Sequence, residues 1–147
     1  MKKRFTHNIK ILGTLLLLGL LPLNAKIVFP STEYKSEDIE WTLAQKSQNI
    51  ALKHLKRTKE ISTHIIRLKG QEKPHYHDRH SLQVLILSGK SQIHFKDHSV
   101  LLEKGDMVII PKGTYHWAEN LSKEASIVLA TYSPAFDGKD KRLVKAK

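Results

Sequence analysis

The sequence predicts an all-β protein, built as a sandwich or barrel of short strands. Short apolar and β-branched runs recur at near-regular spacing over residues 49–132. Glycine, proline and aspartate stand between these runs, where they favour turns. No long stretch after residue 60 shows a helical period of hydrophobic residues. A bundle of helices is therefore excluded.

The sequence predicts a hairpin at the start of this domain. Ile50 and Leu52 alternate with their neighbours within residues 50–55, as in a strand that buries one face. Residues 56–60 are polar and suit the connection, and the β-branched run at residues 61–68 suits the returning strand. Both strands are expected in one antiparallel sheet.

Six further strands are expected, each bounded by a turn. Turn-forming residues occupy 69–74, 88–90, 96–98, 103–106, 111–114 and 120–124. The predicted strands lie between them, at residues 82–87, 91–95, 99–102, 107–110, 116–119 and 126–132. Pro74 also biases the chain toward an extended conformation at His75 and His77. The number of strands suits a β-sandwich or barrel.

The two ends of the chain are expected outside the barrel, which takes residues 49–140. Residues 26–48 mix proline, serine and charges, and predict an N-terminal extension with a short helical turn capped by Ser36. The segment after residue 133 predicts an irregular tail, with Phe136 placed to dock on the barrel. Residues 141–147 form its basic end.

Residues 1–25 have the pattern of a secretory signal peptide. Residues 1–10 carry four Lys or Arg residues and no acidic one, and residues 11–21 are mostly apolar. Pro22 ends this run, and Ala25 stands at a small-residue cleavage site. An uncleaved anchor is the alternative, but the apolar run is shorter than the roughly 20 residues that span a bilayer. We therefore expect cleavage after Ala25 and a periplasmic or secreted protein without a membrane span.

The chain is basic, and this bears on its partners. The formal net charge of +11 falls to +7 when the four bases of the signal peptide are removed (11 − 4). Such a charge attracts anionic partners. The basic residues are spread along the sequence, however, and no nucleic-acid-binding motif accompanies them. We expect a solvated basic surface and no nucleic-acid partner.

Two absences from the sequence limit its chemistry. The chain has no cysteine, so disulfides are excluded and a metal site must use histidine, carboxylate, amide or water. No nucleophile motif or phosphate-binding loop is present. This argues against hydrolases and kinases of the ordinary motif-bearing kinds.

A five-residue pattern near the end of the domain is the strongest motif. It consists of Gly105, Pro111, Gly113, His116 and Asn120. Pro111 and Gly113 shape a tight turn that presents His116. The pattern resembles the second motif of the cupins, a family of small jelly-roll barrels. The resemblance covers roughly residues 50–140 and implies a double-stranded β-helix, the cupin barrel.

The first cupin motif matches only in part. His75 and His77 stand two apart, so their side chains face the same side of an extended segment, and Gly89 closes the motif. Gly70 lies one residue closer to His75 than the family pattern has it. Leu82 stands where the family has a glutamate. In cupins that glutamate is usually the one anionic metal ligand.

The resemblance implies a metal site with an open question about its fourth ligand. The three implied ligands are His75, His77 and His116. His80 extends the histidine pattern, and Gln83 adjoins the glutamate position, although strand alternation turns it away unless a bulge intervenes. Neutral imidazoles suit a divalent transition metal such as Fe, Zn, Ni or Cu, whereas loss of the carboxylate disfavours Mn. The metal's uncompensated charge would attract an anionic small molecule.

Other histidines and aromatic residues are expected to have structural roles. Four histidines lack a partner at ligand spacing and are assigned to strand faces or turns: His54, His64, His94 and His98. Tyr115 and Trp117 flank His116, so alternation directs them to the outer face of the barrel or to a dimer interface.

The family does not fix the function, because one fold hosts many chemistries. One hypothesis is a metal-dependent oxygenase-type enzyme that acts on a small molecule. A second is a non-catalytic cupin that binds a small ligand or the metal, and Leu82 in the glutamate position favours it. A third is a barrel without metal, whose histidines are structural. Small cupins commonly form dimers, so the resemblance also implies a homodimer.

Overall fold

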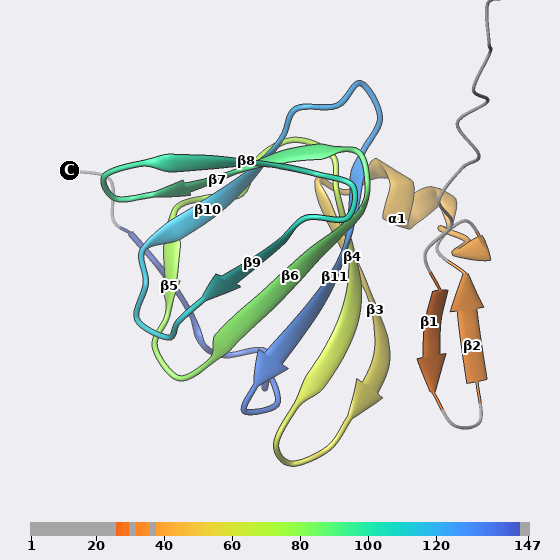
Figure 1. Cartoon of the computed structure of the whole chain (residues 1–147), viewed down its shortest axis with the longest axis horizontal. Helices are drawn as coiled ribbons and strands as arrows, with labels where there is room; N and C mark the ends of the chain where they lie inside the picture. Colours follow the sequence, from red (N-terminus) through yellow and green to blue (C-terminus); the bar gives the residue numbers. More distant parts are fainter. Residues whose placement is uncertain (1–25, 30–31, 36–37, 145–147) are drawn as a thin grey trace, which may run out of the picture.

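The computed structural model describes residues 26–29, 32–35 and 38–144 and confirms the predicted all-β class (Figure 1). The described chain forms two antiparallel five-stranded sheets and a separate two-stranded hairpin. The predicted signal peptide and the helical turn at Ser36 lie outside the described residues. No helix within the described ranges is long and apolar enough to cross a membrane.

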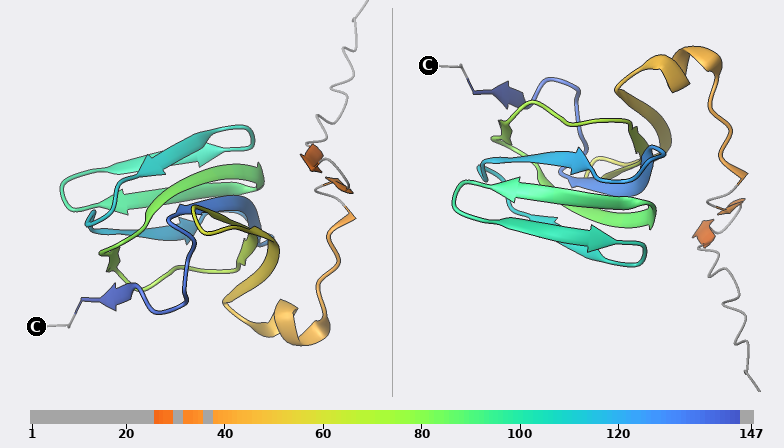
Figure 2. Two further views of the ribbon diagram at one scale, coloured as in Figure 1. Left: turned by 90° about the horizontal axis from the view of Figure 1, so that it is seen from below. Right: turned by 90° about the horizontal axis from the view of Figure 1, so that it is seen from above.

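The two five-stranded sheets stack face to face as a jelly-roll barrel (Figure 2). In order across the first sheet, the strands are β3 (Ile50–Arg57), β4 (Ser62–Leu68), β11 (Ser126–Ser133), β6 (Ser81–Ser88) and β9 (Met107–Ile110). Across the second sheet they are β12 (Lys141–Leu143), β5 (His75–His77), β10 (His116–Asn120), β7 (Lys90–Phe95) and β8 (Ser99–Glu103). Neighbours such as β5 and β10 are far apart in the sequence, so the topology brings distant motifs together.

Every strand predicted between residues 50 and 132 is present, with ends shifted by at most two residues. The N-terminal extension differs from the prediction. It contains a hairpin of β1 (Lys26–Phe29) and β2 (Thr32–Lys35), which the sequence did not predict because each run is short. A helix, α1 (Leu43–Ser47), follows, and Thr42 begins it with a capping box closed by Gln45.

The predicted basic tail contributes a strand. Its first three residues form β12, which pairs antiparallel with β5. In this register Lys141 lies opposite His77 and Leu143 lies opposite His75. Opposite residues of an antiparallel pair point to the same face, so Lys141 shares the inner face with His77.

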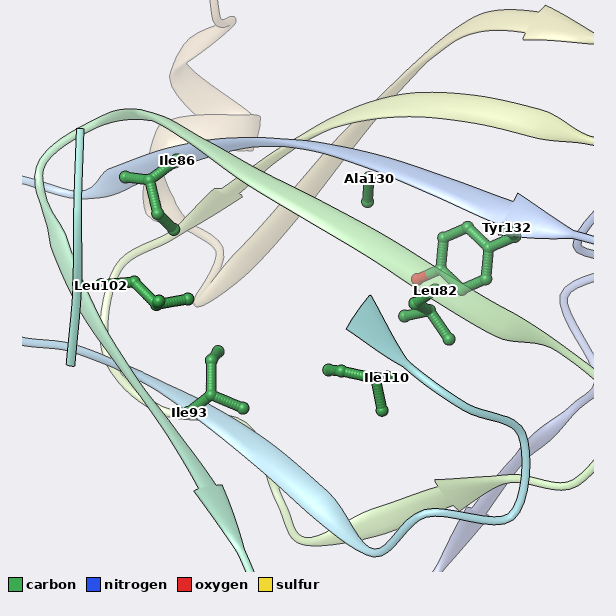
Figure 3. Close-up of a cluster of buried hydrophobic side chains, with 7 residues drawn as sticks. All are labelled: Leu82, Ile86, Ile93, Leu102, Ile110, Ala130 and Tyr132. Carbon is green, nitrogen blue, oxygen red and sulfur yellow. The ribbon is translucent and has the colours of Figure 1, made fainter. Parts of the chain in front are cut away.

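A cluster of buried hydrophobic side chains joins the inner faces of the two sheets (Figure 3). Its members are Leu82, Ile86, Ile93, Leu102, Ile110, Ala130 and Tyr132. The two-residue spacing of Ala130 and Tyr132, and the four-residue spacing of Leu82 and Ile86, follow the alternation of a strand with one face buried. This core fixes which side chains of each strand point into the barrel.

His64 on β4 is a buried titratable group of the barrel, with 1% of its surface exposed. Its Nε2 lies 2.8 Å from the hydroxyl of Ser62, and its ring packs edge-on against Tyr132. Burial lowers the pKa of His64 from 6.5 to about 4, and the charges of His54 and Arg57 add to this. Between about pH 4 and pH 6.5, His64 is therefore neutral in the folded protein but protonated in the unfolded chain.

We expect His64 to make the fold sensitive to acid. Its contribution to the free energy of unfolding is complete above about pH 6.5 and falls by about 1.4 kcal/mol per unit as the pH drops toward 4. Urea denaturation between neutral pH and about pH 5 measures this slope. A His64→Gln variant should show a shallower slope, because it cannot take up the proton. Identical slopes in both proteins would contradict this assignment.

Candidate metal centre

The pairing of β5 with β10 gathers the three predicted histidines at one place. His116 lies directly opposite His75 in this pair, and alternation along β5 puts His77 on the same inner face. All three rings are buried, with at most 4% of each residue exposed. One ring nitrogen from each lies within 4.8 Å of those of the other two. This spacing suits ligands that share one metal ion.

Two of the three histidines are oriented by backbone carbonyls. His75 Nδ1 lies 2.9 Å from the carbonyl oxygen of Lys73, and His116 Nδ1 lies 2.9 Å from that of Thr114. A carbonyl can only accept, so each Nδ1 carries the proton and donates it. Each Nε2 then carries a lone pair. This Nδ1–H tautomer is the form in which a histidine binds a metal through Nε2.

Beside His77, the carboxylate of Asp140 takes the place that a backbone carbonyl takes beside the other two rings. Its Nδ1 is buried without a hydrogen-bond partner among the described residues, and it lies 3.8 Å from Oδ2 of Asp140. Asp140 is itself buried and accepts hydrogen bonds from the backbone N–H groups of Arg79 and His80, at 3.0 to 3.1 Å. It also bonds the His80 ring. At 3.8 Å the carboxylate is too far for a hydrogen bond, but its negative charge lies beside the second nitrogen of His77, where metal-binding histidines commonly have a carboxylate.

The electrostatics favour the form of histidine that binds metals. Burial lowers the pKa of His75 and His77 from 6.5 to about 4, and burial also lowers the pKa of His116. All three rings are therefore neutral near pH 7, so a metal ion does not have to displace protons from them. Burial acts to raise the pKa of Asp140, but hydrogen bonds from His80 and Arg79 outweigh it and lower the pKa to about 2.

Glu72, which no sequence motif identified, lines the same cavity as the three histidines. One carboxylate oxygen accepts a hydrogen bond from the backbone N–H of Ala118 at 3.2 Å, and the other lies 2.8 Å from Nζ of Lys141. Burial acts to raise the pKa of Glu72, but the charge of Lys141 and the hydrogen bonds from Lys141 and Ala118 oppose it, and the pKa lies below its ordinary value. In the sequence, only the position of Glu72 three residues before His75 could have indicated that it lies near the site.

Leu82 lines the cavity, on the inner face of β6. The residue that replaces the family's glutamate thus occupies the interior with an apolar side chain. The next residue, Gln83, is exposed, because alternation turns it outward and the bulge of this pair lies elsewhere, between Ile127 and Val128. The structure therefore does not bring Gln83 to the three histidines.

His80 is buried but has other partners. Its Nδ1 bonds Asp140, and its Nε2 lies 3.3 Å from the carbonyl oxygen of Ala135. Both ring nitrogens are thus taken up by the segment that leads into β12. Among the described residues, the group with metal-ligand spacing contains the other three histidines and not His80.

Residues beside the ligands face away from the cavity. The ring of Trp117 stacks on His94, with 4.5 Å between ring centroids, and Tyr115 packs against both Trp117 and Tyr76. His94 also bonds Glu119 on the same face. These aromatic residues cover the outer side of the second sheet, as alternation predicts for the neighbours of an inward histidine.

The cavity between the two sheets has a volume of about 70 Å³. Most of its wall is aliphatic and comes from the inner faces of both sheets, including Ile66, Val84, Ile86, Ile93 and Val128. Polar groups reach it from the three histidines, Glu72, Ser91 and Tyr132. Burial raises the pKa of Tyr132 above its ordinary value, so its hydroxyl keeps its proton. A metal held by the histidines would face a small apolar chamber with few polar groups.

Comparisons with known proteins agree with this architecture. A family model for the cupin domain matches residues 64–132, which include the three histidines. A protein of Aquifex aeolicus (strain VF5) described as "Uncharacterized protein" is 37% identical over 117 residues, 78% of this chain and 94% of the relative.

Three solved structures illustrate the likeness of fold. KdgF from a Halomonas species has a TM-score of 0.60 at 23% identity, over 70% of this chain and 94% of that chain. A cupin-2 domain containing protein from Shewanella frigidimarina has a TM-score of 0.52 at 22% identity, over 58% and 81% of the two chains. Streptomyces Pac13 with uridine has a TM-score of 0.59 at 16% identity, over 72% and 90%. These structures are all less than 25% identical and support the fold alone, whereas the family model and the two motifs show that residues 64–132 of this chain form a cupin domain.

Proposed function

We propose that this cupin binds a divalent transition metal through His75, His77 and His116 and presents it to a small ligand in the apolar cavity. The observation that carries the proposal is the convergence of three buried, neutral imidazoles whose ring nitrogens lie within 4.8 Å of one another. Structural histidines rarely need this arrangement. The Nε2 atoms of His75 and His116 accept no hydrogen bond from the described residues, so their lone pairs are available to a metal ion.

The donor set favours some metals over others. Three neutral imidazoles without a coordinating carboxylate suit Fe, Zn, Ni or Cu better than Mn, and Leu82 in the glutamate position strengthens this preference. When bound, such a metal supplies Lewis acidity and open coordination positions. The chain orients two of the rings through the carbonyls of Lys73 and Thr114, and it surrounds the site with a small, mostly apolar chamber.

Ligand binding without chemistry is the function that the cavity supports best, since its wall is mostly aliphatic. An oxygenase-type enzyme is the second candidate. It is favoured by two groups on the cavity wall, namely Glu72, which can accept a proton, and Tyr132, which can donate one. Oxygen uptake by the iron-loaded protein with a panel of small acids distinguishes the two. Export of the chain and a homodimer stay predictions of the sequence.

We expect His116→Ala to abolish stoichiometric zinc binding. Wild-type protein should retain about one zinc per chain after dialysis, measured by elemental analysis, and zinc at 100 times its Kd should raise the free energy of unfolding by about 2.7 kcal/mol. His94→Ala is the matched control, because His94 lies on the outer face. Equal zinc content in all three proteins would refute the three-histidine site.

We expect Asp140→Asn to weaken metal binding without removing a ligand. Loss of the carboxylate beside His77 should lower zinc affinity about 10- to 100-fold, measured by competition with a chromophoric chelator. Asp137→Asn is the control, since Asp137 also pairs with Arg79 but makes no hydrogen bond to His77 or His80 among the described residues. Unchanged affinity in a folded Asp140→Asn protein would show that Asp140 serves the loop alone.

We expect Leu82→Glu to restore the family's anionic ligand. The new carboxylate would enter the cavity and raise Mn²⁺ affinity at least about tenfold, or about 1.4 kcal/mol, measured by titration calorimetry. Without metal it should destabilise the fold, because it buries an unpaired charge. Gln83→Glu adds the same charge on the exposed face and should change neither quantity. No gain in Mn²⁺ affinity would argue against Leu82 as the ligand position.

A further inference from the structure

The hydroxyl of Tyr132 is a buried polar group that the metal ligands do not use. Tyr132 lies on β11, and 6% of its surface is exposed. Its side chain lines the cavity that holds the three histidines, and its hydroxyl points from β11 toward the barrel interior (Figure 3). No hydrogen bond joins this hydroxyl to the described residues. Because Tyr132 lines the cavity, this hydroxyl is free to donate a hydrogen bond to a molecule bound there.

Packing holds the ring of Tyr132 in place. It stacks on Phe136, with 4.7 Å between centroids, and meets the edges of His64 and His77 at 5.5 and 5.6 Å. These contacts keep the hydroxyl in the chamber beside a metal-ligand ring. The group is therefore preorganised to meet a molecule in the cavity.

The charges around the cavity favour an anion as that molecule. Glu72 is the one carboxylate among the described residues that line it, and Lys141 already neutralises Glu72 at 2.8 Å. The imidazoles bring no negative charge, and Asp140 beside His77 is paired with Arg79 at 3.3 Å. A bound divalent ion would thus keep its charge uncompensated by the wall, and that charge favours a ligand with an anionic oxygen.

The remainder of the wall limits what the anion can carry. It is built largely from branched aliphatic side chains, among them Ile66, Val84 and Ile93. The volume of about 70 Å³ is roughly five times the ~10–15 Å³ that one water molecule needs by the same measure. A ligand that fills it has few non-hydrogen atoms and an apolar body.

We propose that the cavity binds a short-chain aliphatic carboxylate. Its apolar body packs on the aliphatic wall, and its carboxylate binds at the metal and accepts a hydrogen bond from the Tyr132 hydroxyl. Tyr132 is thereby a specificity-determining residue. This inference rests on the metal site proposed above, and it adds the chemical class of the ligand and the residue that selects it.

Calorimetric titration of the zinc-loaded protein with isobutyrate tests the proposal, after zinc content has been measured. Isobutyramide, a neutral molecule of the same shape, should bind at least about tenfold more weakly, because it lacks the charge. Acetate lacks two methyl groups of the apolar body and should bind about tenfold more weakly. The zinc-free protein should not bind isobutyrate measurably.

A Tyr132→Phe variant removes only the hydroxyl and should keep its zinc. We expect its affinity for isobutyrate to fall about tenfold or more, as for a hydrogen bond to a charged group. Tyr115→Phe, the same change on the outer face, should leave affinity unchanged. The isobutyrate and isobutyramide comparison uses the wild-type protein, so it decides the ligand class even if Tyr132→Phe folds poorly.

Different failures have different meanings. Zinc-loaded wild-type protein that binds no isobutyrate, or binds isobutyramide equally well, would overturn the carboxylate proposal and leave the metal site intact. Equal isobutyrate affinity in wild-type and folded Tyr132→Phe protein would overturn the role of Tyr132. Wild-type protein that binds no zinc would overturn the metal site, and the ligand proposal with it.

Discussion

The pairing of β5 with β10 is the constraint on which the site depends. His116 contributes to the histidine cluster because it lies opposite His75, and a slip of one residue would turn it to the outer face. β5 has three residues, so bonds outside it help to hold the register. Gly113 donates its N–H to the carbonyl of His77 at 2.7 Å, and backbone bonds at 2.8 Å join Glu72 to Ala118 and Gly70 to Asn120. The glycine and asparagine positions of the second cupin motif thus fix the register that presents its histidine.

The other side of β5 is supported by the segment that enters β12. Asp140 links the Arg79–His80 backbone to the edge of His77, and Lys141 reaches the carboxylate of Glu72. The two residues place one negative and one positive charge beside the histidine cluster, and each charge has a nearby partner. Buried charges are tolerated only when they are paired. The end of the chain therefore completes both the geometry and the charge balance of the site.

The replacement of the family's glutamate by Leu82 gives the cavity its character. In a site with that glutamate, the protein itself would neutralise part of the metal's charge. Here Leu82 adds apolar surface, and the carboxylate of Glu72 is engaged by Lys141. The proposed metal site and the Tyr132 hydroxyl could then both bind an oxygen-bearing anion that enters the cavity. The proposed ligand class follows from this combination of an apolar wall and an uncompensated cation.

The sequence by itself determined where the barrel strands lie and which three histidines come together. Both depend on local signals, namely two-residue alternation, turn residues and motif spacing, and alternation also directed Gln83 outward. The sequence did not predict the β1–β2 hairpin or β12, because the runs that form these strands are short. Only the tertiary structure decided the roles of Glu72, His80 and Asp140. Glu72 bonds Ala118 and Lys141, which lie 46 and 69 positions later in the sequence. His80 and Asp140 are separated by 60 positions. Such contacts arise when sheet pairing closes the barrel, and no local pattern encodes them.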